Sequence, residues 1–127
     1  MNSGGAVTSG GAVNEQLAVV IPMLNEAAGV TATLRVLARQ HDADFAVVIV
    51  DNGSSDGSPD VVRTFIERHG LTTWRVITET QKGTGAAADT GFRAAIDAGA
   101  TMVARTDADC LPRRDWTAHL RRALTPP

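Results

Sequence analysis

Short apolar runs separated by longer polar and amphipathic stretches dominate the chain from residue 17 onward. The runs lie at residues 17–21, 45–50, 73–77 and 101–105. Runs of this length, bounded by turn residues, are typical of strands buried on both faces, although the third run partly alternates. The pattern therefore predicts four strands. We expect Pro22 to end the pairing of the first strand, because proline has no N–H to donate.

The stretches between the first three runs have the apolar spacing of helices. Their inner faces are formed by Val30, Leu34, Leu37 and Ala38 in the first stretch and by Val61, Val62, Phe65 and Ile66 in the second. We expect Asn25 to cap the first helix, with Glu26 supplying negative charge in its first turn. Ser58 is expected to cap the second helix, with Pro59 at its first helical position and Gly70 just past its end.

Two further helices are expected over residues 86–98 and 115–124. A strand followed by a helix, repeated four times, favours a mostly parallel sheet with helices on both faces and right-handed crossovers. The predicted fold class is therefore a Rossmann-like α/β domain spanning residues 17–127. The first sixteen residues are rich in Gly, Ser, Ala and Asn, and we expect them to form a disordered tail.

Composition narrows the classes of function. The 127 residues carry a net charge of −2 without a concentrated basic cluster, which argues against a nucleic-acid surface. The single cysteine, Cys110, excludes an intramolecular disulfide and a cysteine-based zinc cluster. The chain has neither a signal-peptide pattern nor an apolar run long enough to span a bilayer. We therefore expect a cytoplasmic protein, with a location peripheral to the membrane as the alternative.

Polar clusters follow the predicted strands at residues 25–26, 51–56, 82–85 and 107–109. The carboxyl ends of parallel strands share one edge of a sheet, and ligands bind at that edge. Asp107 and Asp109 are two residues apart, so an extended backbone would point both carboxylates to one side. Such a pair repels unless a cation lies between, and carboxylate oxygens suit Mg²⁺ or Mn²⁺. The alternative is that this short motif forms only a surface turn.

Roles for the clustered residues follow from their chemistry. Asp51 can accept hydrogen bonds from the ring N–H groups of a nucleobase, Asp107 can bind ribose hydroxyls, and Asp109 can bind the cation that bridges a diphosphate. Gly83 and Gly85 would let the backbone approach a ligand closely. Each feature also has a purely structural interpretation: a tight turn at Asp51, the helix dipole for Glu26, a solvated loop for Lys82 and a helix-surface charge for Asp89.

Motifs of competing nucleotide-binding proteins are absent from the sequence. The first strand is followed by Pro-Met-Leu-Asn-Glu at 22–26, without the Gly-x-Gly-x-x-Gly of dinucleotide-binding dehydrogenases. The chain contains no P-loop and no Gly-x-Ser-x-Gly elbow. A nucleotidyltransferase is disfavoured because it would need a glycine-rich, basic phosphate loop at this first turn.

Four segments carry a resemblance to a known family. They are Val-Ile-Pro-Met-Leu-Asn-Glu at 20–26, Val-Asp-Asn-Gly-Ser-Ser-Asp at 50–56, Lys-Gly-Thr-Gly-Ala-Ala-Ala-Asp-Thr-Gly at 82–91, and Thr-Asp-Ala-Asp-Cys-Leu-Pro at 106–112. In this order and spacing they resemble the nucleotide-sugar-binding half of family 2 glycosyltransferases, which have the GT-A fold. The resemblance implies metal-dependent, inverting transfer of a sugar from a UDP or GDP donor to an unknown acceptor.

The resemblance also implies the site residues. Pro22, Asn25, Glu26, Asp51 and Gly83 would bind the nucleotide-sugar, Asp107 would face the ribose or the sugar, and Asp109 would bind Mg²⁺ or Mn²⁺. Residues 89 and 110 depart from the family pattern, because many members have Asn and an acidic residue there.

The family's acceptor-binding half and its general base are expected beyond Pro127. We therefore predict that this chain binds the donor weakly and transfers little sugar alone. Two alternatives remain: a catalytically inactive binding module, or a fragment of a split enzyme that needs a partner subunit or self-associates.

Overall fold

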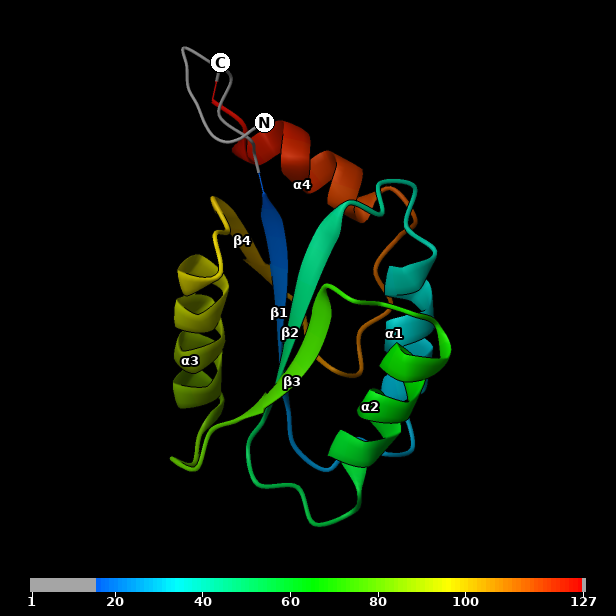
Figure 1. Cartoon of the computed structure of the whole chain (residues 1–127), viewed down its shortest axis with the longest axis vertical. Coiled ribbons are helices and arrows are strands. Elements are labelled where there is room, and N and C mark those ends of the chain that lie inside the picture. The colour runs from blue at the N-terminus through cyan, green and yellow to red at the C-terminus, as the bar shows by residue number, and fades with distance from the viewer. Residues whose placement is uncertain (1–15, 127) are drawn as a thin grey trace.

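A computed structural model describes residues 16–126, in which four strands form one sheet between helices (Figure 1). The elements are β1 (Leu17–Met23), α1 (Val30–Ala38), β2 (Phe45–Asp51), α2 (Ser58–Arg68), β3 (Trp74–Thr78), α3 (Thr84–Asp97), β4 (Met102–Arg105) and α4 (Trp116–Leu124). All pairings are parallel, and the strand order is β3-β2-β1-β4. The predicted α/β class and element order are confirmed.

The direction of winding reverses beside β1, because β2 and β3 lie on one side of it and β4 on the other. In open α/β sheets, a crevice forms at the carboxyl ends of the two strands where the order reverses. In this chain, that crevice lies between the ends of β1 and β4.

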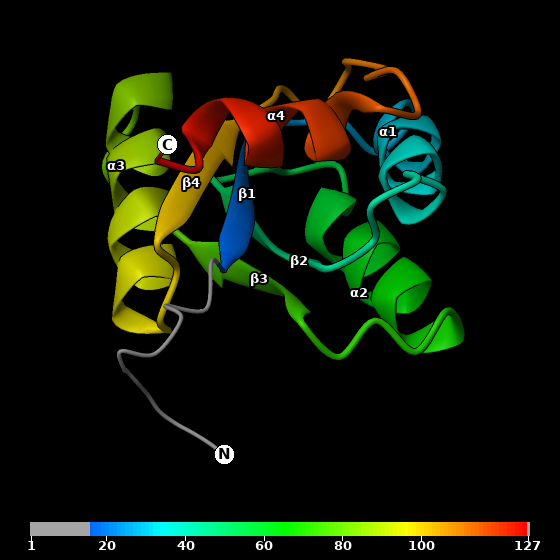
Figure 2. The same cartoon turned by 90° about the horizontal axis from the view of Figure 1, so that it is seen from above.

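Side chains of β1 alternate between two cores. Val19 and Ile21 pack with α1 and α2, whereas Ala18 and Val20 pack with α3. Figure 2 shows α3 on one side of the sheet and α1 and α2 on the other. The α3 side is the tighter one, since a Cβ added at Gly91 would lie 2.3 Å from Cγ1 of Val20. Small residues of α3 therefore let the helix approach the sheet closely.

The strand β1 does not end at Pro22 as predicted. It continues to Met23, which pairs with Asp51. Backbone groups of successive strand residues face opposite neighbours, and the carbonyl of Val20 accepts from Thr106 on the β4 side. The missing N–H of Pro22 therefore faces the β4 side, where pairing has already ended at Arg105. Proline costs no ladder hydrogen bond at that position.

The predicted helix starts also need correction. Asn25 does not cap α1, which begins at Val30 with Gly29 as its N-cap and no side-chain cap. Asn25 instead has a φ of 53° and belongs to the turn before the helix. Ser58 is the first residue of α2, after the N-cap Gly57, so the predicted capping position is off by one. Helix α3 begins at Thr84, two residues before its predicted start.

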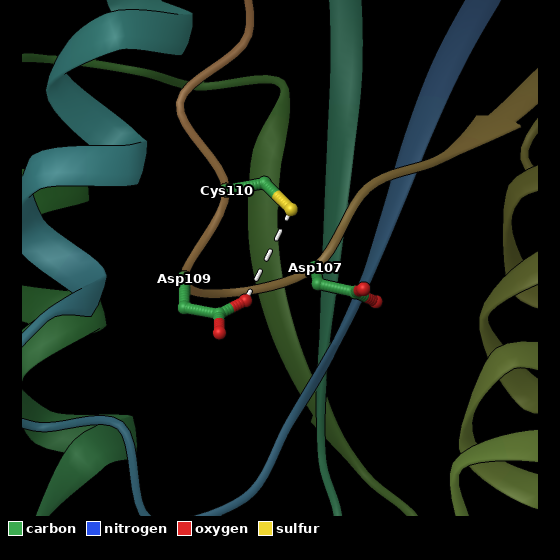
Figure 3. Close-up of side chains that lie close together, drawn as sticks. All are labelled: Asp107, Asp109 and Cys110. Atoms are coloured by element: carbon green, nitrogen blue, oxygen red, sulfur yellow. Dashed lines mark hydrogen bonds between the residues drawn. The ribbon is translucent and has the colours of Figure 1, made fainter.

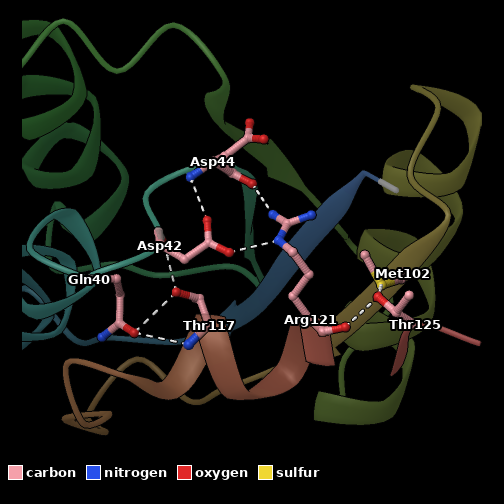
Figure 4. A network of polar contacts seen from close by, with 7 residues as sticks. All are labelled: Gln40, Asp42, Asp44, Met102, Thr117, Arg121 and Thr125. Carbon is pink, nitrogen blue, oxygen red and sulfur yellow. Dashed lines mark hydrogen bonds and ion pairs between the residues drawn. The ribbon is translucent and has the colours of Figure 1, made fainter. Parts of the chain in front are cut away.

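A polar network fixes α4 beside the amino ends of the strands (Figure 4). Nε of Arg121 lies 2.7 Å from Oδ2 of Asp42, in the segment that leads into β2. Burial raises the pKa of Asp42, but the hydrogen bond from Arg121, the N–H of Asp44 and the Arg121 charge outweigh it and leave the pKa below its usual range. Thr117 of α4 is buried and donates to the carbonyl of Asp42 at 2.6 Å.

Gln16 is the last residue of the expected tail, yet it is hydrogen-bonded: its carbonyl accepts from the N–H groups of Thr101 and Met102. The predicted disorder of residues 1–15 lies outside the described residues. Between residues 16 and 126, none of the helices has the length and apolar character needed to cross a membrane.

Candidate functional site

A cavity of about 670 Å³ opens at the carboxyl ends of β1 and β4. Its walls are formed by Pro22, Met23, Leu24, Asn25, Glu26, Asn52, Gly53, Thr80, Lys82, Gly83, Thr84, Ala87, Arg105, Asp107, Ala108 and Asp109. These residues come from the last residues of β1 and β4, from the segments that follow the four strands, and from the first turn of α3. The cavity therefore occupies the switch point that the strand order defines.

The loop after β4, here called the acidic loop (residues 106–115), carries the exposed carboxylates of Asp107 and Asp109 near its start and that of Asp115 at its end. The side chain of Ala108 is buried in the core between the sheet and α1. Asp107 and Asp109, on either side of it, are exposed. The N–H of Cys110 closes a turn on the carbonyl of Asp107 at 3.1 Å. Burial of the central alanine thus directs both neighbouring carboxylates outward into the cavity wall.

The acidic loop has a donor set that fits a hard divalent cation. Ligand atoms of Asp107, Asp109 and Cys110 lie within 4.8 Å of one another (Figure 3). Sγ of Cys110 lies 4.0 Å from Oδ1 of Asp109. Carboxylate oxygens suit Mg²⁺ and Mn²⁺, whereas a thiolate prefers softer metals. The two carboxylates are therefore the fitting ligands, and phosphate oxygens could complete the coordination.

Two cationic side chains share the cavity with these carboxylates. An Nη atom of Arg105 lies 3.3 Å from Oδ1 of Asp107, and Lys82 lines the wall formed by the segment before α3. Both can contribute positive charge toward a bound anion. Arg105 is not among the site residues that the sequence predicts, although its position two residues before Asp107 places it at the same strand end.

Asp51 directly precedes Asn52 and Gly53, which line the cavity, and is itself buried. It is 5% exposed at the end of β2, and its Oδ2 accepts from the N–H groups of Gly53 and Ser54 at 3.3 and 3.2 Å. Its Oδ1 is the only buried side-chain polar atom without a hydrogen-bond partner in the described part of the chain. A buried carboxylate oxygen left in this state costs free energy until a donor reaches it.

The turn after β1 and the loop after β2 are joined by side chains. Together they form one wall of the cavity (residues 22–27 and 51–58), which we call the nucleoside wall for the role that we propose for it. Backbone N–H groups donate to side chains across the two segments: Asn25 N to Ser54 Oγ (2.8 Å), Ser55 N to Asn25 Oδ1 (2.8 Å), Glu26 N to Ser58 Oγ (2.9 Å) and Ala27 N to Asp56 Oδ2 (3.0 Å). The hydroxyl of Ser58 donates to Asp56, and this bond, with the N–H of Ala27, lowers the pKa of Asp56. The wall is therefore internally braced.

Asn52 connects this wall to the segment before α3. Its Nδ2 donates to the carbonyls of Glu79 and Gln81, both at 2.9 Å, and its Oδ1 accepts from the N–H of Gly83 at 3.0 Å. Gly83 has a φ of 124°, a conformation that side-chain-bearing residues rarely adopt. Sequence reasoning assigned Asn52 only to a turn signal, because its three partners lie 27 to 31 residues away.

The structure places most of the predicted site residues around one cavity, but neither Asp51 nor Gly85 lines it. Pro22, Asn25, Glu26, Gly83, Asp107 and Asp109 all line the cavity. Asp51 does not line it, and its successors Asn52 and Gly53 do. Asp51 ends β2 and Asp109 follows β4. Because these strands are parallel, both residues lie at the same edge of the sheet, as the sequence predicted.

Fold and site together define an α/β domain with a polar crevice at its switch point. The chain belongs to glycosyl transferase family 2, whose family model matches residues 18–126. It is 31% identical over 102 residues to glycosyltransferase AglE of Haloferax volcanii, covering 79% of this chain and 32% of AglE. It is 52% identical over 54 residues to a validoxylamine A glucosyltransferase of Streptomyces hygroscopicus, covering 41% of this chain and 13% of that protein.

Solved structures show the same architecture. A mannosyltransferase, PcManGT from Pyrobaculum calidifontis, in complex with GDP-Man and Mn²⁺, superposes with a TM-score of 0.78 at 33% identity, covering 88% of this chain and 33% of that one. Glucosyl-3-phosphoglycerate synthase from Mycobacterium tuberculosis, solved with Mn²⁺ and UDP, superposes with a TM-score of 0.64 at 21% identity, covering 87% and 40%. The predicted GT-A fold is confirmed. The chain spans about a third of the length of AglE and of PcManGT.

Proposed function

We propose that the chain binds a nucleoside diphosphate sugar together with Mg²⁺ or Mn²⁺, as the donor-binding part of a glycosyltransferase. The observation that carries the proposal is that Asp107 and Asp109 converge on a cavity whose opposite wall is the braced pair of loops around Asn25. One wall offers negative charge for a cation, and the other offers a rigid surface for a nucleoside. PcManGT, which is 33% identical, was solved with a ligand and an ion of these kinds.

On the acidic loop, Asp109 and Asp107 would hold the cation with their carboxylate oxygens. When bound, a divalent cation neutralises the diphosphate and stabilises it as a leaving group. Lys82 and Arg105 line the same cavity and would contribute additional positive charge. The chain as a whole has a net charge of −2 and attracts an anionic ligand little. The cation, Lys82 and Arg105 would supply the positive charge locally, beside the phosphates.

On the nucleoside wall, Asp51 would accept a hydrogen bond from the base. Its Oδ1 lacks a partner while Oδ2 is held by two backbone N–H groups, so the carboxylate keeps one acceptor beside the cavity residues Asn52 and Gly53. Uracil and guanine both carry a ring N–H that fits this acceptor. Pro22, Glu26 and Gly83 would bound the space around the nucleoside and the diphosphate.

Transfer of the sugar with inversion requires a base that removes the proton of the acceptor hydroxyl. We assign no residue of this chain to that step, because the carboxylates of the cavity are committed to the donor and its cation. The chain's share in the reaction is then to bind and orient the donor. The same residues would serve a binding module without turnover, so binding and transfer need separate measurements.

Calorimetric titration with UDP and GDP, each with and without Mn²⁺, tests the proposal. We expect binding of at least one nucleotide that strengthens markedly when Mn²⁺ is present. A parallel assay with the corresponding sugar nucleotides measures hydrolysis and transfer. Binding without turnover would support the binding-module alternative, whereas no nucleotide binding under either condition would refute the proposed function.

A further inference from the structure

We propose that Thr33 and Gln40 are positioning residues that hold the acidic loop in the shape at which Asp107 and Asp109 converge, and that they thereby set the affinity for the divalent cation. This inference rests on the proposed function for its metal, but the contacts are independent of it. Thr33 lies within α1, and Gln40 follows two residues after the end of that helix. Both are buried, at 0% and 5% exposure.

Thr33 contacts the acidic loop on both sides of Asp109. Its hydroxyl lies 2.9 Å from the carbonyl oxygen of Ala108 and 2.7 Å from that of Cys110, so one proton is shared between two acceptors. The inner face of α1 is otherwise apolar around Thr33, with Val30, Leu34 and Leu37 fully buried. A hydroxyl is costly there unless it is hydrogen-bonded, so its partners explain its presence.

Gln40 holds the far end of the same loop. Its Nε2 donates to the carbonyl of Arg113 at 2.7 Å, and its Oε1 accepts from the N–H of Thr117 at 3.0 Å. The hydroxyl of Thr117 lies 3.2 Å from the same Oε1 and shares its proton between Gln40 and the carbonyl of Asp42. The N–H of His41 adds a bond to the carbonyl of Arg114 at 2.8 Å. The loop is therefore attached to α1 and the residues that follow it near both of its ends.

The sheet itself gives the acidic loop little support. The last bond of the β1–β4 ladder runs from the N–H of Thr106 to the carbonyl of Val20, one residue before Asp107. Beyond it, two exposed carboxylates of like charge repel each other, which favours separating them. The attachment from α1 opposes that separation, and the buried side chain of Ala108 fixes the direction in which both carboxylates point.

Groups that orient a metal ligand through a second contact affect affinity strongly. Their loss typically weakens metal binding by about 10- to 100-fold. Thr33→Val keeps the shape of the side chain and removes its hydroxyl, whereas Thr33→Ser keeps the hydroxyl. We expect Mn²⁺ binding to weaken by about tenfold or more in Thr33→Val and to stay within about twofold of the parent in Thr33→Ser.

A matched control is available on the same helix. Thr31 is half-buried and lines the groove between α1 and α2, away from the acidic loop. Thr31→Val therefore makes the same chemical change without touching the loop, and we expect parental Mn²⁺ affinity. Gln40→Met is a second test variant, which removes the contacts to Arg113 and Thr117. We expect it to weaken Mn²⁺ binding as well, and it replaces Thr33→Val as the test if that variant does not fold.

Two measurements separate this inference from the proposed function. Electron paramagnetic resonance of free Mn²⁺ gives the affinity, and amide hydrogen exchange of residues 106–116 without metal reports the order of the loop. We expect faster exchange in that segment in Thr33→Val, with β1 and β2 unchanged. Unchanged loop exchange, or parental Mn²⁺ affinity in a loosened loop, would overturn the inference. A parent that binds no Mn²⁺ would refute the metal site, while the exchange data would still decide whether α1 holds the loop.

Discussion

The two walls of the cavity are stabilised in different ways. The nucleoside wall uses its own side chains, so that Asn25, Ser54, Ser58 and Asp56 are bonded within it. The acidic loop is held from behind through its backbone carbonyls, and its carboxylates remain exposed. Polar side chains of the nucleoside wall are hydrogen-bonded to one another's segments, whereas the carboxylates of Asp107 and Asp109 remain accessible to a ligand.

This difference follows from what each wall must recognise. A planar, neutral base is selected by shape and a few fixed hydrogen bonds, which a rigid surface provides. A cation needs charged oxygens that still have free lone pairs, so support must come from groups other than the carboxylates. Asp51 combines both arrangements, since one oxygen is held and the other has no partner.

The largest effect on ligand binding is expected from Asp109→Asn, which removes a negative charge from the acidic loop. A hydrogen bond or contact to a charged group contributes about 1.5–3 kcal/mol, or about 10- to 150-fold in affinity. Mn²⁺-dependent nucleotide binding should fall by that factor, and binding without Mn²⁺ should change little. Asp97→Asn, an exposed change at the far end of α3, is the control. Equal loss with and without Mn²⁺ would contradict the separation of the two walls.

A change in the core that supports both walls should lower the stability of the whole domain. Gly91 of α3 offers such a change, because it packs against β1 and β2. The Cβ of Gly91→Ala would meet Cγ1 of Val20 at 2.3 Å and Cγ2 of Val50 at 2.9 Å. Overpacking of this kind costs about 1–3 kcal/mol. Gly85→Ala in the same helix meets nothing within 4 Å and should instead stabilise the fold by about 0.4–1 kcal/mol. Urea unfolding measures both, and equal midpoints for the two variants would be inconsistent with close packing of α3.

Asp51→Asn tests the nucleoside wall alone. It replaces one carboxylate oxygen with an amide donor, which conflicts either with the N–H groups of Gly53 and Ser54 or with the base. We expect nucleotide affinity to fall by about 1 kcal/mol, or about fivefold. Mn²⁺ affinity without nucleotide should not change, because Asp51 lies outside the acidic loop. A loss of Mn²⁺ binding measured by paramagnetic resonance would show that the two walls are not independent.

The smallest effect concerns acid pH. The hydroxyl of Ser58 and the N–H of Ala27 lower the pKa of Asp56 in the folded protein. A lowered pKa stabilises the folded state above the unfolded value of about 3.9, and that contribution is lost as pH falls through the folded pKa. The amide signals of Ala27 and Ser58 should therefore stay constant above about pH 5 and shift only in stronger acid. In Asp56→Asn this shift should disappear, and in Asp60→Asn, an exposed change nearby, it should remain.

The fold was largely predictable because its signals are local. Apolar runs and helical spacing identified all eight elements, and the parallel order brought the strand-end clusters of Asp51 and Asp107 to one edge. The errors occurred where distant contacts override local preference. Asn25 has the chemistry of a cap, yet it bonds to Ser55, thirty residues away. Pro22 is tolerated in β1 only because β4 stops short of it.

The supporting residues of the site were harder to find than its ligands. Asp107 and Asp109 form a short recognisable motif, and their chemistry follows from their charge. Thr33 and Asn52 carry no such signal, because their partners lie 75 and 77 residues away for Thr33 and 27 to 31 residues away for Asn52. A single threonine in an apolar helical face was the one available hint, and its meaning depended on knowing which backbone carbonyls faced it.

Paramagnetic broadening of amide signals by Mn²⁺ in the presence of a nucleoside diphosphate shows where the cation binds. We expect broadening centred on residues 107–110 that extends to Asn25 and Gly53 across the cavity. Signals of α4 residues near Arg121 and of the amino end of β1 should remain sharp. Broadening centred elsewhere, or none at all, would contradict a cation site shared between the acidic loop and the nucleoside wall.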